Sequence, residues 1–162
     1  NDAGQVAVVL NLDAGNVRAV YRFSPGPSGV EATEIARVEA AGTIRAIDSF
    51  APAMNNDGLV TFRGRDANGQ AIYVGDGTTL RRVIGKDDLV ATDLGIAGIG
   101  QHVDDPNGWP IFSGAPGINA HGDIAFIAGL YPQGNNQVEW GSGVFVAYAD
   151  GDVIFQDGFE NP

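Results

Sequence analysis

The sequence has no cysteine, a single lysine and two histidines. Without cysteine, neither a disulfide framework nor a thiolate metal site can form, although this says nothing about the compartment. Lysine and arginine together number 9 against 20 aspartates and glutamates, which gives a formal net charge of −11. A surface that binds nucleic acid needs clustered basic side chains, so this balance argues against nucleic acid as a partner. We interpret the acidity first as a source of solubility and second as a capacity to bind cations.

Long apolar runs and the usual catalytic motifs are missing as well. No run approaches the ~20 residues that a membrane-spanning helix needs. No serine stands in a Gly-x-Ser-x-Gly sequence, and there is no phosphate-binding loop that ends in lysine. The chain begins with Asn1, without an initiator methionine or a signal-peptide pattern. We therefore expect a processed product or a fragment of a longer chain.

Glycine and proline are abundant by contrast. The 24 glycines and 8 prolines punctuate apolar runs and form no low-complexity blocks, and 44% of the residues are hydrophobic. This pattern is typical of many short strands joined by tight turns. A compact domain of this length buries roughly 70% of its unfolded surface, so a sizeable core is expected.

One sequence pattern occurs twice in full and once in part. It reads Pro-x-apolar-Asn-x-x-Gly-x-apolar-small-apolar, with full copies at 52–62 and 116–126 and a partial copy at 1–8. The positions that define the full copies are Pro52, Asn55, Gly58, Phe62, Pro116, Asn119, Gly122 and Phe126. The partial copy carries Val8 where the others have phenylalanine. Such repeats describe an architecture more clearly than an activity.

Each residue of this motif has a structural explanation. Proline fixes φ and ends the hydrogen-bonded ladder of the preceding strand. The asparagine side chain bonds nearby backbone groups in an Asx turn, and the glycine three residues later supplies a positive φ. The phenylalanine then enters the innermost strand as a core residue. The functional alternative is that the repeated asparagines line one face and bind a ligand.

Apolar periodicity predicts about three strands in each repeat. In the first repeat the candidate strands are 5–12, 17–23, 31–39 and 44–47. The segment 31–39 also contains helix formers, but comparison with the second repeat favours a strand. The strands predicted in the second and third repeats are 59–65, 70–74, 79–84, 123–130, 143–148 and 153–155. Asn68-Gly69 separates two of them and is a strong hairpin signal, so we expect little or no helix.

Three or four antiparallel strands per repeat, at a period of ~50 residues, are the signature of propeller-type blades. We predict an all-β fold with three such blades, in units of about 1–50, 51–114 and 115–155. Together they form a single domain, 1–155, followed by a tail, 156–162. Closed propellers typically have four or more blades. We therefore expect a partial propeller, or one that other copies complete.

The spacing Asn55-x-x-Gly58-x-x-x-Phe62 and its second copy resemble the signature of a family of bacterial tandem-repeat proteins. The flanking segments 71–73, 75–77 and 143–145 also follow the sequence pattern of these repeats. Proteins of this family are secreted or surface-anchored, β-propeller-like and of unknown function. The segment 155–160, Phe-Gln-Asp-Gly-Phe-Glu, is similar to a short tail at the carboxyl end of many secreted proteobacterial proteins. The resemblance implies a bacterial protein that is exported or displayed on the cell surface.

The longest irregular stretch, residues 85–113, is the candidate site. Loops of this length are usually functional or irregular, and we expect one short strand within it. Its candidate binding residues are His102, Asp104, Asp105, Asn107 and Trp109. A histidine beside two carboxylates could bind a metal or act as a general base, and an exposed tryptophan could stack on a sugar. In the structural alternative, Trp109, Trp140 and Tyr131 close the ends of the core, and His121 is a surface turn residue.

Calcium is the better cofactor candidate, because carboxylate and amide oxygens in glycine-rich turns suit a hard cation. The candidate ligands are Asp66 with Asn68, Asp87 with Asp88, and Asp104 with Asp105 and Asn107. None of these groups reproduces the spacing of a known calcium loop. Solvated turn residues are the structural alternative, and our first expectation is that no cofactor is needed.

Two functional hypotheses follow. The first is a non-catalytic, exported β-repeat module that associates with other copies of itself or with a surface protein, in adhesion or in self-assembly into a fibre or surface layer. It rests on the repeats, on the acidity and on the strand edges that three units leave open. The second is a glycan-binding or hydrolytic propeller whose site lies in the 85–113 insert, and it rests on analogy with other propellers.

Overall fold

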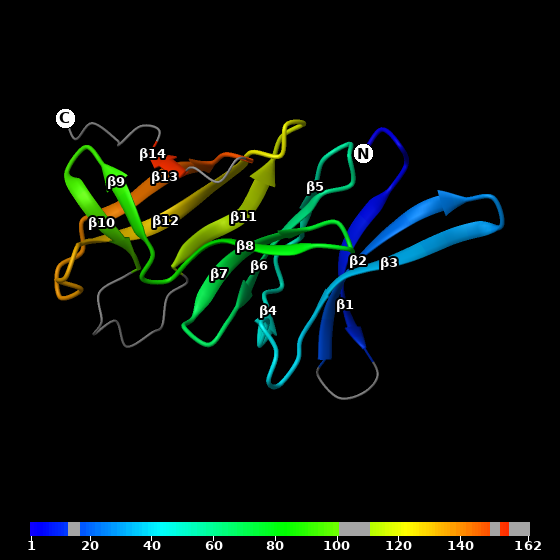
Figure 1. Cartoon of the computed structure of the whole chain (residues 1–162), viewed down its shortest axis with the longest axis horizontal. Helices are drawn as coiled ribbons and strands as arrows, with labels where there is room; N and C mark the ends of the chain where they lie inside the picture. Colours follow the sequence, from blue (N-terminus) through cyan, green and yellow to red (C-terminus); the bar gives the residue numbers. More distant parts are fainter. Residues whose placement is uncertain (13–16, 101–110, 150–152, 156–162) are drawn as a thin grey trace.

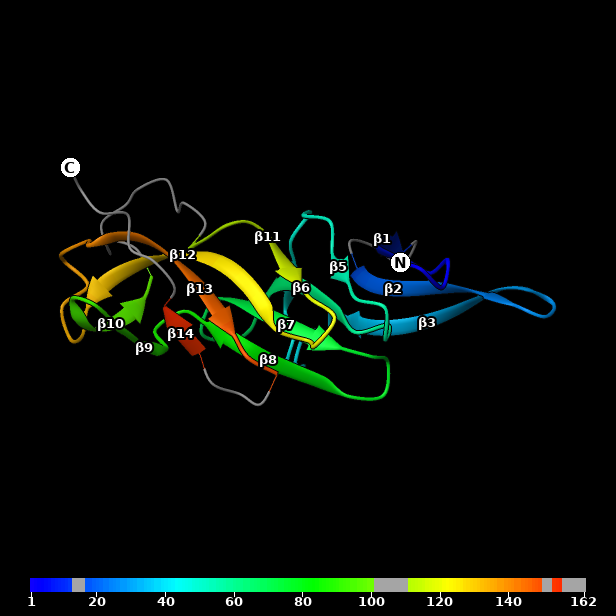
Figure 2. The same ribbon diagram turned by 90° about the horizontal axis from the view of Figure 1, so that it is seen from above.

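A computed structural model describes residues 1–12, 17–100, 111–149 and, for the backbone, 153–155. These residues form three antiparallel β-sheets and no helix, which confirms the predicted all-β class (Figure 1). The sheets follow one another along the chain and lie in an open row. The N-terminal sheet is at the right of Figure 1 and the C-terminal sheet at the left, and Figure 2 shows the same order from above.

The first sheet has the order β1–β2–β3, with bounds Val6–Leu12, Val17–Gly26 and Gly29–Arg37. β1 and β2 pair without interruption, from Val6 opposite Phe23 to Leu12 opposite Val17. The segment that offered a choice between strand and helix is strand β3. Its residues Ile35 and Ala36 are buried against the second sheet, and this burial outweighs local helix propensity. The β2–β3 hairpin extends beyond the rest of the sheet (Figure 2).

The second sheet has the order β4–β6–β7–β8, and β5 also pairs with β6. The bounds are Ala46–Ile47 for β4, Ala53–Met54 for β5, Val60–Arg65 for β6, Gln70–Gly75 for β7 and Leu80–Gly85 for β8. The β6–β7 hairpin turns at Asn68-Gly69, as expected. The candidate fourth strand of the first repeat is β4, but it pairs with β6 and so belongs to the second sheet. Ile44 and Ile47 are buried at this joint, which explains why the chain crosses over before it forms β4.

The third sheet has the order β14–β13–β12–β10–β9, with β11 also beside β12. The bounds are Leu89–Thr92 for β9, Gly95–Ile99 for β10, Phe112–Ile118 for β11, Ile124–Pro132 for β12, Gly141–Ala147 for β13 and Val153–Phe155 for β14. The 85–113 insert was expected to hold one short strand, but it contributes the hairpin β9–β10. This hairpin pairs with the end of β12, where Ala97 lies opposite Pro132. β12 has nine residues, three more than β6, and therefore has room for this extra partner.

Two apolar clusters hold the row together, one at each joint between neighbouring sheets. The cluster between the first and second sheets includes Val20, Ile35, Val60, Phe62 and Tyr73. The cluster between the second and third sheets includes Ile72, Val74, Phe112, Phe126 and Phe145. β7 contributes to both clusters and is buried along its whole length. The second sheet is therefore covered on both faces, whereas the first and third sheets are each covered on one.

Tyr73 carries an unpaired hydroxyl into the first of these clusters. Its ring is fully buried and stacks on Phe62, with the ring centroids 5.6 Å apart. Within the described part of the chain, the hydroxyl group has no hydrogen-bond partner. Burial raises the pKa of Tyr73 to about 12. Burial, with a hydrogen bond to Asp87, also raises the pKa of Tyr131 to about 12.

We expect Tyr73→Phe to leave the free energy of unfolding at pH 7 unchanged or raised by up to about 1 kcal/mol, because an unsatisfied hydroxyl is removed from the core. A phenol whose folded-state pKa is raised stabilises the fold fully below pH ~10, and this contribution is lost as the pH rises towards 12. The variant should therefore lose less stability than wild type over that window, as measured by urea unfolding at pH 7 to 11.

Tyr131→Phe is the matched control, because the Tyr131 hydroxyl donates to Asp87 at 2.9 Å. Its loss should cost about 1 kcal/mol at pH 7. A loss of that size for Tyr73→Phe as well would contradict the assignment of an unpaired hydroxyl.

Candidate functional site

The repeated Asn-x-x-Gly motif forms the same hydrogen-bonded turn in all three sheets. Each motif asparagine accepts, on its main-chain oxygen, the N–H of the motif glycine three residues later, over 3.0, 3.2 and 3.1 Å. Each also uses its side-chain oxygen to accept the N–H of the residue four positions later, over 3.0, 3.0 and 2.9 Å. Gly4, Gly58 and Gly122 have φ values of 69°, 81° and 89°, which residues that carry a Cβ atom rarely adopt. The motif is therefore a folding device that starts β1, β6 and β12.

The two motif prolines do not lie at the end of the preceding strand's hydrogen-bonded ladder, where we expected them. Pro116 lies inside β11, where the pairing with β12 shifts between Ser113 and Gly117. Pro52 directly precedes β5, in the gap between β4 and β5. Because proline has no N–H to donate, it falls where the ladder is already interrupted, and pairing resumes after it.

The asparagine side chains also connect one sheet to the next. The Asn1 Nδ2 donates to the Asn55 main-chain oxygen over 2.9 Å, and the Asn55 Nδ2 donates to the Asn119 oxygen over 3.3 Å. Asn119 comes last, and its Nδ2 turns back to the Asp123 carboxylate of its own motif over 2.8 Å. This bond lowers the pKa of Asp123. The series of inter-sheet bonds thus stops at Asn119 within this chain.

The outward side of the first sheet is apolar along β1 and β2, and we call this part the N-terminal face; β3 borders it with the Glu34–Arg37 ion pair, which the Tyr21 hydroxyl joins. Ala7 and Val9 of β1 pack against the second sheet, so the alternate residues point the other way. The N-terminal face consists of Val6, Val8, Leu10, Tyr21 and Phe23. The rings of Tyr21 and Phe23 stack, and Val6 is 55% exposed. At the matching motif positions of the second and third sheets, Val60, Phe62, Ile124 and Phe126 are buried.

The outward side of the third sheet is the counterpart, which we call the C-terminal face. Phe126 and Phe145 point towards the second sheet and are buried there. The alternate residues on the same strands form the C-terminal face: Ala125, Ile127, Val144 and Val146. Ile127 is 40% exposed. In the motif, Ala125 and Ile127 correspond to the residues of β1 that pack against the second sheet.

The edge of β1, the inner strand of the first sheet, is also open within the described part of the chain. β6 pairs with β4 and β5 on the side away from β7, and β12 pairs with β10 and β11 on the side away from β13. Among the described residues, β1 pairs with β2 alone. An unpaired edge beside an apolar face is a feature that folded proteins usually cover.

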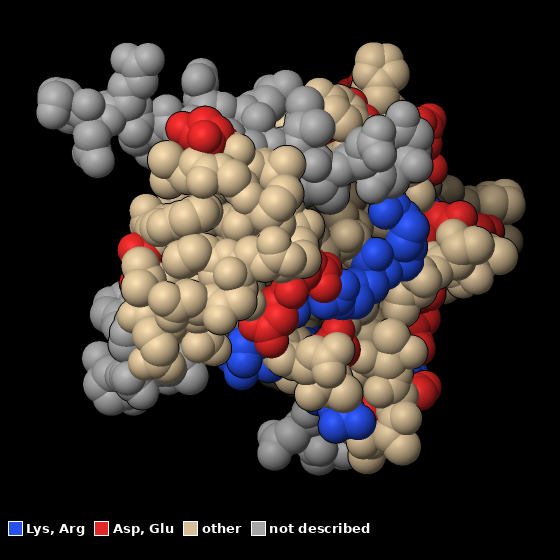
Figure 3. Space-filling view, turned by 60° about the vertical axis from the view of Figure 1, so that its left-hand side comes forward, with Lys and Arg blue, Asp and Glu red and all other residues tan. Residues whose placement is uncertain are grey.

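Charge is distributed unevenly along the row of sheets. All nine basic residues lie within 1–86, together with nine acidic ones. The remaining eleven acidic residues lie within 87–162, so that half of the chain carries the whole net charge of −11. Figure 3, which brings the third sheet forward, shows a largely neutral lobe beside a band of mixed basic and acidic side chains. The two halves of the sequence therefore differ in net charge.

The carboxylates proposed as calcium ligands in the described segments already have partners. Asp66 Oδ1 accepts the N–H groups of Asn68 and Gly69, and its Oδ2 accepts from Arg82. Asp88 also accepts from Arg82, over 2.6 Å. Asp87 accepts from the Tyr131 hydroxyl. No group of three or more potential metal-ligating residues occurs in the described part of the chain.

The predicted binding residues of the insert, His102, Asp104, Asp105, Asn107 and Trp109, lie outside the described residues. Of the other aromatic candidates, Tyr131 is buried and Trp140 packs against the second core cluster. His121 is exposed in the motif turn. The two outward faces were not anticipated, although a signal exists. Residues 6–10 are all apolar, a pattern of strands covered on both faces, and they lie in an end sheet.

No family model, curated protein or solved structure matches the chain. The described segments include no helix long and apolar enough to cross a membrane. A functional assignment therefore rests on geometry: the two outward faces, the open edge of β1 and the inter-sheet hydrogen bonds of the motif asparagines.

We expect Asn55→Ala to lower the free energy of unfolding by about 2 kcal/mol, because it removes a buried turn and an inter-sheet bond together. Asn119→Ala is the matched control. It removes an equivalent turn, but the side chain is exposed and bonds within its own motif, so about 1 kcal/mol is expected. Urea unfolding measures both. Equal losses would contradict a role for Asn55 in joining the sheets.

Proposed function

We propose that this protein is a non-catalytic association module that assembles head to tail, the N-terminal face of one copy packing on the C-terminal face of the next. The observation that carries the proposal is the pair of outward apolar faces at opposite ends of the row. Each has a matching face within the chain that is buried at a joint between sheets. Unlike the buried counterparts, these two faces are not covered by another sheet among the described residues.

The internal joints supply the template for the contact between copies. At the first joint, Val60 and Phe62 of β6 pack against Val9 of β1 and its neighbours. In a head-to-tail contact, Val6 and Val8 would pack in the positions that Val60 and Phe62 have at the internal joint. Ile127 of another copy would pack against them, in the position that Val9 has at that joint. Burying each aliphatic or aromatic side chain of this kind stabilises a contact by about 1.5–3 kcal/mol before association entropy is counted.

The asparagine series extends across the same contact. The Asn55 main-chain oxygen accepts two hydrogen bonds, one from Gly58 and one from Asn1. The Asn1 oxygen accepts only the bond from Gly4 within the described residues, so it has capacity for a second. The Asn1 Nδ2 bonds both Gln5 of its own motif and Asn55, so the Asn119 Nδ2 could likewise keep its bond to Asp123 and donate its second N–H to Asn1 of the next copy.

Charge favours this polarity over a symmetric pairing of like ends. Two C-terminal halves placed together would each bring a net charge of −11, whereas the N-terminal half has equal numbers of acidic and basic residues. A head-to-tail contact closes into a ring when its rotation permits and otherwise extends as a fibre. A ring would place several copies' sheets around one axis, as in a propeller of more than three blades.

The motif resemblance supports an exported setting. Secreted and surface-displayed bacterial repeat proteins carry the same Asn-x-x-Gly-x-x-x-Phe spacing, so we place the assembly outside the cell or on its surface. A surface protein with a similar face would be the heterologous partner.

Two variants test the assignment in combination. Val8→Asp disables the N-terminal face, and Ile127→Asp disables the C-terminal face. Each charge would be buried without a partner, so each variant alone should associate at least ~30-fold more weakly than wild type. An equimolar mixture should form a heterodimer and nothing larger, because one intact face of each kind remains. Sedimentation velocity from 1 to 500 μM measures the species.

Leu80→Asp is the control, because Leu80 is 42% exposed on the second sheet and belongs to neither face. It should assemble as wild type does, and circular dichroism verifies that each variant is folded. A wild-type chain that stays monomeric at 500 μM would overturn the proposal. Failure of the two face variants to combine, while wild type assembles, would overturn the head-to-tail geometry.

A further inference from the structure

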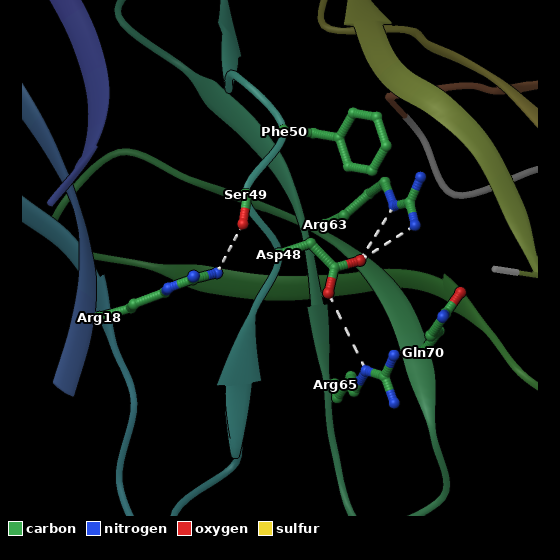
Figure 4. A pocket seen from close by; sticks show the side chains of 7 residues that line it. All are labelled: Arg18, Asp48, Ser49, Phe50, Arg63, Arg65 and Gln70. Carbon is green, nitrogen blue, oxygen red and sulfur yellow. Dashed lines mark hydrogen bonds and ion pairs between the residues drawn. The ribbon is translucent and has the colours of Figure 1, made fainter. Parts of the chain in front are cut away.

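A basic pocket lies at the rim of the second sheet, on the side of β6 that faces the third sheet, and Arg18 of the first sheet completes its lining, apart from both outward faces. It has a volume of about 280 Å³ and is lined by Arg18, Asp48, Ser49, Phe50, Arg63, Arg65 and Gln70. Arg18 comes from β2, Arg63 and Arg65 from β6, Gln70 from β7, and the rest from the segment between β4 and β5. Figure 4 shows Asp48 joined to Arg63 and Arg65, and Arg18 joined to Ser49 beside them. The guanidinium groups of Arg63 and Arg65 approach the one carboxylate, and Arg18 adds a third positive charge to the lining, in a chain whose net charge is strongly negative.

Arg63 and Asp48 form the fixed floor of this pocket. The Arg63 side chain is 2% exposed and contacts Asp48 Oδ2 through Nε at 3.2 Å and through Nη2 at 3.0 Å. Its Nη1 donates to the Gly114 oxygen over 2.7 Å, and the guanidinium lies 4.3 Å from the centroid of the Phe50 ring. Burial lowers the pKa of Arg63, and Asp48 opposes this effect. The charge of Asp48 is thus largely engaged by a buried partner.

Arg65 and Arg18 keep donors that nothing in the described structure uses. Arg65 approaches Asp48 only through Nε, at 3.9 Å, and its side chain is 51% exposed. Arg18 donates through Nη1 to the Ile47 oxygen at 2.8 Å and to Ser49 Oγ at 3.0 Å. These bonds fix the guanidinium while Nη2 remains without a described partner. The net result is a pocket with two positive charges in excess.

Gln70 adds a neutral donor to the same wall. Its Oε1 accepts the main-chain N–H of Ile111 over 2.8 Å, which fixes the orientation of the amide. The Nε2 group has no partner among the described residues, although the side chain is almost buried. Phe50, 42% exposed, supplies an apolar wall beside these polar groups.

We infer that this pocket binds the oxyanion group of a small organic ligand, a carboxylate or a phosphate, between Arg65, Arg18 and the Gln70 amide. Guanidinium groups present paired N–H donors that match both oxyanions, and the Arg18 group, which Ile47 and Ser49 already hold, loses little entropy on binding. The Phe50 ring would contact the carbon part of the ligand. This inference does not depend on the proposed association, because none of the pocket residues belongs to either face.

The test is a titration followed by ¹⁵N NMR of the arginine Nε–H groups, with benzoate and inorganic phosphate as separate probes. Sodium chloride at equal ionic strength corrects for screening. We expect a saturable shift of the Arg65 and Arg18 signals at millimolar concentrations of at least one probe. Saturation by benzoate alone indicates a carboxylate ligand, and saturation by phosphate alone indicates a phosphate ligand.

Arg65→Gln should weaken binding at least 10-fold, and its exposed position makes a folded variant the expected outcome. Arg81→Gln is the matched control, because Arg81 is an exposed arginine outside the pocket. Phe50→Ala should weaken benzoate binding more than phosphate binding. The absence of saturation by either probe at 50 mM would overturn the inference. Equal weakening by Arg65→Gln and Arg81→Gln would do so too, because it would indicate general charge attraction.

Discussion

The structure depends on the need of each sheet to bury an apolar face against the next one. A sheet with apolar residues on both sides exposes apolar surface to water when it stands alone, and here each joint buries aromatic and branched side chains from two sheets. The asparagine motif sets the geometry of these joints. Its side-chain oxygen builds the turn that begins each inner strand, and its amide reaches the neighbouring motif. One residue type therefore begins the inner strand of a sheet and, through Asn1 and Asn55, connects that sheet to the next.

Stacking of this kind buries both faces of the middle sheet. It leaves each end sheet with one outward face, and these two faces differ. β7 is buried on both sides, whereas Val6 and Ile127 are exposed at opposite ends of the row. The two outward faces correspond to opposite sides of the repeat. This geometric difference, together with the concentration of negative charge in the C-terminal half of the sequence, is the physical basis on which we propose a head-to-tail assembly.

Much of the local structure could be predicted from the sequence. Alternating apolar residues indicated the strands, Asn68-Gly69 marked its hairpin, and the motif residues indicated an Asx turn with a positive-φ glycine. The pairing of β4 with the second sheet was not predictable, because it depends on where Ile44 and Ile47 find an apolar surface. The pocket was missed for a similar reason: Arg18 and Arg63 are 45 positions apart, and only the joint between sheets brings them together. Arginines at alternate positions 63 and 65 of one strand were the available signal.

The central claim is that the joint between copies repeats the joint between sheets. A cryo-electron microscopy or crystal structure of the assembled protein tests it most directly, through the distance between the Asn119 side-chain amide of one copy and the Asn1 main-chain oxygen of the next. We predict a hydrogen bond of about 3 Å there, with β1 of one copy packed on β12 and β13 of its neighbour. A symmetric contact between like ends, or an assembly in which both outward faces stay open to solvent, would contradict the account.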